Sequence, residues 1–270
     1  MNIYFIKNLN KMDKFYKTEE RFKILEFSDY MIIKPNNKKK YEYCMFFFAG
    51  FNENAAKYSY LFKIFLENLN FDIPLKIVIP FLPIYKPDEY PRAWMSNPDK
   101  FSQLNAWYSY EITEDDDKTY KFTILPNREK DQKVIKMILK EIDKLGNSEK
   151  IILGGFSMGG RYLLEILTKM NINTKFNFVF KSSFIFYNNP KKDEKDSPLN
   201  KNKFYCYFSA NDKIAIYPRS ISSVNILKTE FGNVTVKFDN GVTTHTVDYK
   251  CLAYLENILR KEILKGVANF

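Results

Sequence analysis

Hydrophobic and polar positions along the chain follow two alternating spacings. Short runs of β-branched or aromatic residues, typical of buried strands, alternate with longer segments in which apolar residues recur every three or four positions. This alternation predicts an α/β protein with a mostly parallel central sheet flanked by helices. The predicted strands span residues 23–34, 41–48, 75–79, 149–153, 176–181, 204–208 and 234–238. The predicted helices span residues 54–69, 129–145, 158–170, 216–231 and 246–265.

The order of these segments predicts one large domain. A chain of 270 residues can bury a sizeable core, and no change of composition divides the predicted elements. We predict an α/β domain over residues 41–270 and an N-terminal extension over residues 1–40 that packs on it. Residues 80–127 break the pattern, because they are rich in proline and contain both tryptophans. Long irregular segments are usually functional, so we predict a lid or an aromatic-rich pocket loop there.

The cysteine and histidine content limits the chemistry that the chain can perform. Cys44, Cys206 and Cys251 are far apart and each lies in an apolar run, as is typical of reduced core residues in an intracellular protein. One histidine and no CxxC pair cannot supply a Cys/His zinc site, although carboxylates could still bind a hard cation. We predict no structural metal.

The chain is basic, with 42 Lys+Arg against 32 Asp+Glu and a net charge of +10. A basic surface attracts phosphate, but only six of these residues are arginines, which make most base and planar phosphate contacts. We therefore predict no nucleic-acid partner. No apolar run reaches 18 residues, and the N-terminus does not resemble a signal peptide. We predict a cytoplasmic protein whose contact with an anionic membrane, if it occurs, is peripheral.

The sharpest chemical signal is Gly155-Phe156-Ser157-Met158-Gly159, which lies between a predicted buried strand and a predicted helix. A GxSxG pattern in this context is typical of the strained nucleophile elbow of α/β-hydrolases. The glycines allow the backbone and the helix to approach closely, and the serine hydroxyl projects clear of the sheet. We predict Ser157 as a nucleophile. The alternative is a tight glycine-rich turn with an incidental serine.

A nucleophilic serine needs a base within hydrogen-bond reach, and His245 is the one histidine of the chain. It follows the last predicted strand, where the chain order serine, acid, histidine of this fold places the base. The acid should follow the preceding strand, and Asp212 does so. Asp212 could instead cap a helix, and Asp239 and Asp248 are competitors for its role. We predict Ser157, Asp212 and His245 as the catalytic residues.

Acyl transfer also needs two donors directed at the developing oxyanion. The backbone N–H of Met158, next to the nucleophile, should be one. The other should come from the loop after the strand that ends at Phe48, and we predict the backbone N–H of Phe51.

These residues carry a family resemblance. Residues 152–160, Ile-Leu-Gly-Gly-Phe-Ser-Met-Gly-Gly, resemble the nucleophile elbow of the phospholipase/carboxylesterase group of α/β-hydrolases, which includes acyl-protein thioesterases. The resemblance covers roughly residues 42–265. Other matching segments are Pro80-Phe81-Leu82-Pro83 (a proline-bracketed turn), Trp107-Tyr108 (a Trp-aromatic pair), Arg128-Glu129 (the start of a helix), Asp212 and His245.

The chain also departs from this family. Where members have a His-Gly-Leu-Gly-Asp loop, residues 49–53 read Ala-Gly-Phe-Asn-Glu, and Ser109 replaces the aspartate that usually follows the Trp-aromatic pair. The N-terminal 40 residues have no clear counterpart. We therefore expect a substrate choice that differs from that of typical members.

The resemblance implies hydrolysis of fatty-acyl thioesters or esters, including palmitoyl-cysteine on proteins, without metal or cofactor. The implied partner is a fatty-acylated protein or a lipid-like acyl ester. Aromatic residues in loops that follow strand ends supply material for an acyl groove. The predicted substrate-binding residues are Trp94, Trp107, Tyr108 and Phe81.

Two other functions fit the same residues. A small-ester carboxylesterase or a lysophospholipase would use the same triad. A hydrolase-fold protein that binds an acyl ligand without turnover is suggested by the altered loop at residues 49–53. The sequence does not indicate an oligomeric state.

Overall fold

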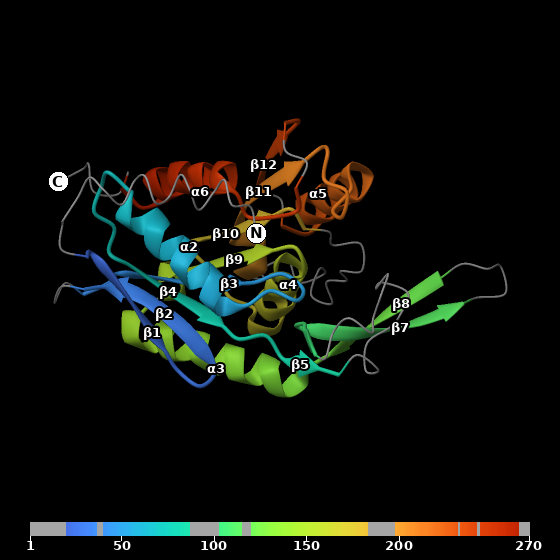
Figure 1. Cartoon of the computed structure of the whole chain (residues 1–270), viewed down its shortest axis with the longest axis horizontal. Coiled ribbons are helices and arrows are strands. Elements are labelled where there is room, and N and C mark those ends of the chain that lie inside the picture. Colours follow the sequence, from blue (N-terminus) through green and yellow to red (C-terminus); the bar gives the residue numbers. More distant parts are fainter. Residues whose placement is uncertain are drawn as a thin grey trace.

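The computed structural model describes residues 20–36, 40–86, 103–114, 120–182, 198–231, 233–241 and 244–264. An eight-stranded sheet with the order β1-β2-β4-β3-β9-β10-β11-β12 forms the centre of this part of the chain (Figure 1). Its strands are β1 (Phe22–Glu26), β2 (Tyr30–Pro35), β3 (Tyr43–Phe48), β4 (Leu75–Pro80), β9 (Ile151–Phe156), β10 (Phe176–Phe180), β11 (Lys203–Ser209) and β12 (Asn233–Asp239).

Six neighbouring strands of the sheet, from β4 through β3 and β9 to β12, run parallel. Parallel strands covered on both faces consist of continuous apolar residues, and β4, β9 and β10 are buried along their full length. In the described part of this sheet, the antiparallel pairs are β1 with β2 and β2 with β4. Since parallel strands point the same way, the loops after β3, β9, β10 and β11 meet at one edge of the sheet.

Helices cover both faces of the sheet (Figure 1). Helix α2 packs on β1, β2 and β4, helix α4 on β9 and β3, and helix α5 on β11 and β12. Asparagine side chains cap the first turns of α2 and α3, at Asn54 and Asn127. The helices are α2 (Ala55–Glu67), α3 (Arg128–Leu145), α4 (Met158–Met170), α5 (Tyr217–Phe231) and α6 (Tyr249–Glu262), with 3₁₀ turns at Ser148–Lys150 and Pro198–Lys201.

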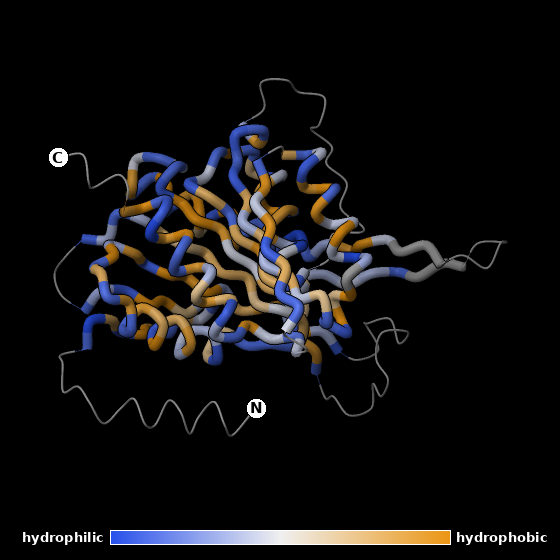
Figure 2. Tube along the Cα trace, turned by 90° about the horizontal axis from the view of Figure 1, so that it is seen from above, coloured by the Kyte–Doolittle hydropathy of each residue, from blue (hydrophilic) through white to orange (hydrophobic). Residues whose placement is uncertain are grey.

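Aromatic side chains fill much of the core. The ring of Phe47 on β3 lies 4.9 Å from that of Tyr58 and 4.7 Å from that of Phe62, both on α2. Such ring pairs add to the apolar area that they bury. Figure 2 shows the apolar residues along the strands in the interior, with polar residues around them. Packing of the core therefore accounts for a large part of the 17% aromatic content.

The structure corrects the prediction of an irregular segment at 80–127. The described part of it contains short strands β5 (Ile84–Tyr85) and β6 (Leu104–Asn105) and a hairpin of β7 (Tyr108–Glu114) and β8 (Tyr120–Pro126). The hairpin projects from the body of the molecule (Figures 1 and 2). Aromatic and polar residues alternate at the start of β7, a strand period that the prolines and charges around it obscured.

The prediction of one strand over residues 23–34 is also wrong. The chain reverses between β1 and β2, where the N–H of Phe27 donates to the carbonyl of Tyr30, because Ser28 and Asp29 favour a turn. Strand β2 then pairs with β4, inside the central sheet. The division of the chain at residue 40 stays a prediction.

Among the described residues, none of the helices combines the length and the apolar character that a bilayer span requires.

Candidate active site

Ser157 occupies a sharp turn between β9 and α4. Its backbone has φ 52° and ψ −122°, in the positive-φ range that side chains other than glycine seldom adopt. Its N–H donates to the carbonyl of Phe180 at the end of β10, 3.0 Å away. A strained serine at the end of a central strand, followed directly by a helix, is the geometry of a nucleophile elbow.

Two glycines make this turn sterically feasible. A β-carbon on Gly155 would lie 2.5 Å from the carbonyl oxygen of Gly159, and one on Gly159 would overlap the carbonyl oxygen of Phe48. Both obstacles are backbone atoms, which cannot move aside as a side chain can. The close approach of α4 to β9 therefore depends on glycine at position 155, and its close approach to the end of β3 depends on glycine at position 159.

The structure brings His245 to Ser157. The Nε2 atom of His245 lies 2.8 Å from the Oγ atom of Ser157, although 88 residues separate them in the chain. The ring of Phe156 lies 4.9 Å from the imidazole and supports it. The histidine side chain is 12% exposed. A base that is mostly buried yet within hydrogen-bond distance can take the serine proton directly.

Asp212 completes the arrangement. Its Oδ2 atom lies 2.7 Å from Nδ1 of His245, and its Oδ1 atom accepts from the N–H groups of Ile214 and Ala215 at 2.8 and 2.9 Å. Burial opposes ionisation of this carboxyl, but the hydrogen bonds from His245 and from these N–H groups together lower the pKa of Asp212 below its usual value. An ionised Asp212 requires Nδ1 to carry the proton, which leaves Nε2 free to accept one from Ser157.

Asp239 and Asp248, the other candidates for the catalytic acid, have other partners. Asp239 accepts from Tyr207 and pairs with Lys250, both at 2.7 Å. Asp248 caps α6 through the N–H groups of Lys250 and Cys251 and pairs with Lys181. Asp212 is thus the carboxylate that the structure places against His245.

The loop after β3 lies next to the serine. A β-carbon on Gly50 would lie 3.3 Å from the β-carbon of Ser157. Phe51, the next residue, packs with Met158 against a small cluster formed by Leu104 and Ala106. The first N–H groups of a helix have no partner within the helix, so that of Met158 is directed away from α4. The structure therefore brings together the two residues predicted to form an oxyanion hole.

The four predicted substrate-binding residues have different surroundings. Trp107 is fully buried, stacks on Tyr162 with ring centroids 4.3 Å apart, and donates from Nε1 to the carbonyl of Ala49 at 2.8 Å. Tyr108 packs on the main core, and burial raises its pKa to about 12. Phe81 follows β4, two strands from β9, and also packs on the main core. Trp94 lies outside the described residues.

Two contacts near the serine were not predicted from the sequence. The hydroxyl of Ser182 donates to the carbonyl of Ser157 at 2.5 Å, and Lys181 binds the loop that carries His245. The signal available in the sequence was their place at the end of the strand predicted over residues 176–181, at the edge of the sheet where Ser157 was expected.

Other nucleophiles and metal ligands are less well placed. Burial raises the pKa of all three cysteine thiols, that of Cys251 to about 12, so they stay protonated at neutral pH. Among the residues that the structure describes, no group of three or more His, Cys, Asp or Glu side chains could hold a metal ion.

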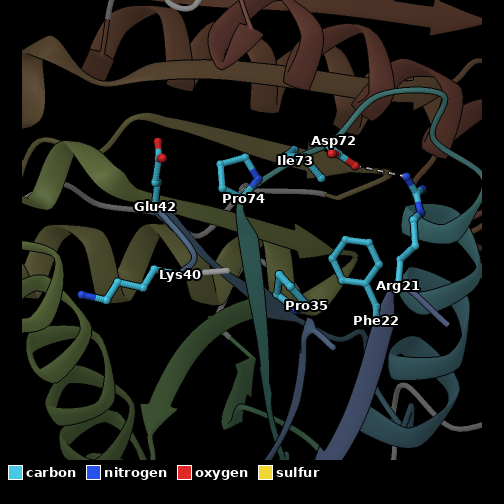
Figure 3. A pocket seen from close by; sticks show the side chains of 8 residues that line it. All are labelled: Arg21, Phe22, Pro35, Lys40, Glu42, Asp72, Ile73 and Pro74. Carbon is cyan, nitrogen blue, oxygen red and sulfur yellow. Dashed lines mark ion pairs between the residues drawn. The ribbon is translucent and has the colours of Figure 1, made fainter. Parts of the chain in front are cut away.

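A cavity of about 520 Å³ lies at the opposite, amino-terminal edge of the sheet, where Arg21 pairs with Asp72 (Figure 3).

Comparison with known proteins places this geometry in context. A family model described as Phospholipase/Carboxylesterase matches residues 91–263, more than half of the chain. No curated protein sequence matches the chain significantly.

Several solved structures share the fold. SOBER1 of Arabidopsis thaliana is 14% identical with a TM-score of 0.64, and the match covers 82% of this chain and 99% of that one. Acyl-protein thioesterase 2 of Zea mays is 16% identical with a TM-score of 0.62, over 87% and 99% of the two chains. Esterase PE8 is 13% identical with a TM-score of 0.58, over 83% and 94%. These similarities confirm the predicted α/β-hydrolase fold.

Proposed function

This chain belongs to the phospholipase/carboxylesterase family, and from that premise we propose that it is a serine hydrolase of acyl thioesters or esters. One observation carries the proposal. The Oγ atom of Ser157 lies 2.8 Å from Nε2 of His245, whose Nδ1 atom lies 2.7 Å from Asp212. This relay orients a neutral imidazole toward the serine hydroxyl, which is what nucleophilic attack requires.

In the first half of the reaction, His245 removes the proton from the Ser157 hydroxyl as the oxygen attacks the acyl carbonyl carbon. The carbonyl oxygen becomes an oxyanion, which the N–H groups of Met158 and Phe51 stabilise. Asp212 stabilises the imidazolium that forms. When the tetrahedral intermediate collapses, the bond from the acyl carbon to the thiol sulfur or alcohol oxygen breaks. His245 returns its proton to this leaving group, and the acyl group remains on Ser157.

In the second half, water takes the place of the leaving group. His245 removes a proton from the water as its oxygen attacks the acyl-enzyme, and the same donors stabilise the second oxyanion. Collapse breaks the bond to Ser157, which receives the proton from His245. The products are a fatty acid and the free thiol or alcohol. No cofactor enters the cycle.

Fatty-acyl thioesters on proteins are the proposed substrates, as for an acyl-protein thioesterase that removes palmitate. The similarity to acyl-protein thioesterase 2 of Zea mays supports this choice. Small esters or lysophospholipids are the alternative, supported by the family description and by the similarity to esterase PE8. The net charge of +10 supports peripheral contact with an anionic cytoplasmic membrane, where acylated proteins reside.

Hydrolysis of acyl thioesters and esters of increasing chain length by the purified protein tests this proposal. We expect turnover that is lost in Ser157→Ala and a kcat/KM that rises with chain length. A preference for the shortest esters would favour the carboxylesterase alternative. Thermal stabilisation by a long-chain ligand without hydrolysis of any substrate would instead indicate a protein that binds acyl groups without turnover.

A further inference from the structure

The residue that follows β10, Lys181, has an unusual conformation and an unusual environment. Its backbone φ is 46°, in the left-handed range that a lysine seldom adopts. Its side chain has no exposed surface. A buried ammonium group is costly unless it is paired and hydrogen-bonded, so the surroundings of this lysine must compensate for its charge.

The ammonium group of Lys181 binds the segment that carries His245. It donates to the carbonyl of Thr244 at 3.1 Å and to that of Thr246 at 2.7 Å, the residues directly before and after the histidine. Its third contact is Oδ2 of Asp248, 2.8 Å away. A lysine has three donors, and these three acceptors use all of them.

Asp248 links this contact to α6. Its other carboxylate oxygen, Oδ1, accepts from the N–H groups of Lys250 and Cys251, both at 3.0 Å, and so caps the helix. Residues 244–248, which include His245, are therefore held at two places. Lys181 fixes the carbonyls on either side of His245, and the capped helix fixes the residues that follow.

The residues on either side of Lys181 bind the nucleophile. The carbonyl of Phe180 accepts from the N–H of Ser157 at 3.0 Å, and the hydroxyl of Ser182 donates to the carbonyl of Ser157. Residues 180–182 thus contact the backbone of Ser157 and the segment of His245 at once. These three residues therefore set the distance between Ser157 and His245.

We propose that Lys181 is a positioning residue that holds His245 in reach of Ser157. The inference rests on the proposed serine hydrolase function. Lys181 touches neither Ser157 Oγ nor the imidazole through any of its three ammonium contacts, and it acts through the backbone carbonyls of Thr244 and Thr246. Small displacements of a catalytic group can lower a rate by about 100-fold, so a contact of this kind can control kcat without meeting the substrate.

Lys181→Met removes the three donors and keeps a long unbranched side chain. We expect kcat for a thioester substrate to fall by about 100-fold while KM changes less than about threefold. Lys76→Met is the matched control, because Lys76 forms a similarly buried pair with Glu141 at 2.6 Å, between β4 and α3. It is expected to lower stability and to leave kcat per folded molecule within about twofold of the wild-type value.

The single histidine offers a second measurement that does not depend on turnover. In protein labelled with ¹⁵N-histidine, the Nδ1–H proton that faces Asp212 gives one resonance, which belongs to His245. We expect this resonance to shift and broaden in Lys181→Met and to stay at its wild-type position in Lys76→Met. A general loss of stability would affect both variants alike.

Should Lys181→Met fail to fold, Asp248→Asn tests the same contact, because asparagine also caps helices but lacks the charge that pairs with Lys181. Its kcat is expected to fall about tenfold, and an unchanged kcat would overturn the inference. A folded Lys181→Met variant with wild-type kcat and the wild-type His245 resonance would overturn it too. If the wild-type protein hydrolyses nothing, the proposed function fails, and the resonance alone then decides whether Lys181 positions His245.

Discussion

The indole Nε1 of Trp107 donates a hydrogen bond of 2.8 Å to the carbonyl oxygen of Ala49, the first residue after β3. Both residues are fully buried, and the indole ring is fixed by its stack on Tyr162 and its edge-on contact with Phe48. This contact anchors the loop that contains Gly50 and Phe51, next to Ser157. An altered loop sequence at residues 49–53 can therefore still have a fixed conformation.

Trp107→Phe removes this donor and leaves a buried carbonyl without its partner. We expect a loss of about 1–3 kcal/mol in the free energy of unfolding. The kcat of the folded protein should also fall, by about tenfold, because the donor at Phe51 shifts relative to the oxyanion. Urea unfolding and steady-state kinetics measure the two effects. Phe62→Leu on α2 serves as the control, since it removes core contacts of Phe47 without touching Ala49; equal kcat losses in both variants would contradict the assigned role.

Gly159→Ala should prevent the turn at Ser157 from forming. The new β-carbon would overlap backbone atoms of β3, and we expect a destabilisation of about 3 kcal/mol or more. At Gly241 a β-carbon would meet only side-chain ends, the Nζ atom of Lys250 at 3.2 Å and the Oδ1 atom of Asp239 at 3.4 Å. Gly241→Ala is thus the mild control. Thermal unfolding of both variants compares them, and a Gly159→Ala protein as stable as Gly241→Ala would refute this view of the turn.

Asp212→Asn and Asp239→Asn distinguish two of the aspartates that the sequence left open as the acid. An amide in place of the carboxylate favours the wrong imidazole tautomer, so kcat should fall on the order of 10³- to 10⁴-fold. The amide oxygen can still accept from Ile214 and Ala215, and the fold should persist. Asp239→Asn, which alters the contacts with Lys250 and Tyr207, should keep kcat within about threefold of wild type. The reverse ranking of the two variants in steady-state assays would assign the acid to Asp239.

The stability of the protein should decline in acid. The pKa values of Asp212, Glu141, Glu165 and Glu262 are all lowered in the folded state; burial raises each of them, but the hydrogen bonds and cations that each carboxylate meets outweigh it. The unfolded chain therefore binds more protons in the acidic range. The stabilisation is complete above the unfolded pKa values, near 3.8 for Asp and 4.5 for Glu, and is lost as the pH falls through the lower folded values.

Glu262→Gln tests this linkage at one site. Glu262 on α6 accepts from Tyr205 and pairs with Lys203. The variant should lose less unfolding free energy than the wild type between pH 6 and pH 3, roughly the range in which carboxylates titrate. Urea unfolding at several pH values measures how the free energy of unfolding changes with pH. An identical change in the variant and the wild type would show that this carboxylate does not contribute.

The sequence could predict that Ser157, Asp212 and His245 lie together, because their meeting depends on chain order and strand ends. In a parallel sheet the loops after the strands meet at one edge, so Ser157 after β9, Asp212 after β11 and His245 after β12 had to converge there. The glycines on either side of the serine then specified the turn. The helix predicted over residues 158–170 has the observed bounds of α4, because its apolar spacing is regular and its start is set by the turn.

The supporting contacts could not be predicted in the same way. Whether Trp107 faces a ligand or the core depends on Tyr162, a residue far along the chain that stacks on it. The left-handed backbone of Lys181 has no signal in a run of residues that is otherwise typical of a strand. Local spacing predicts elements, whereas these contacts arise only when distant elements pack together.

Covalent labelling of the purified protein by a fluorophosphonate tests most directly whether Ser157 is an activated nucleophile. The Ser157 oxygen attacks phosphorus, fluoride leaves, and His245 takes the serine proton, so one adduct should form on Ser157 and be detected by intact mass and peptide mapping. We expect a single modification in the wild type, none in Ser157→Ala, and strongly slowed labelling in His245→Ala. No labelling of the folded wild-type protein, or equal labelling of Ser157→Ala, would contradict the claim that Ser157 is an activated nucleophile.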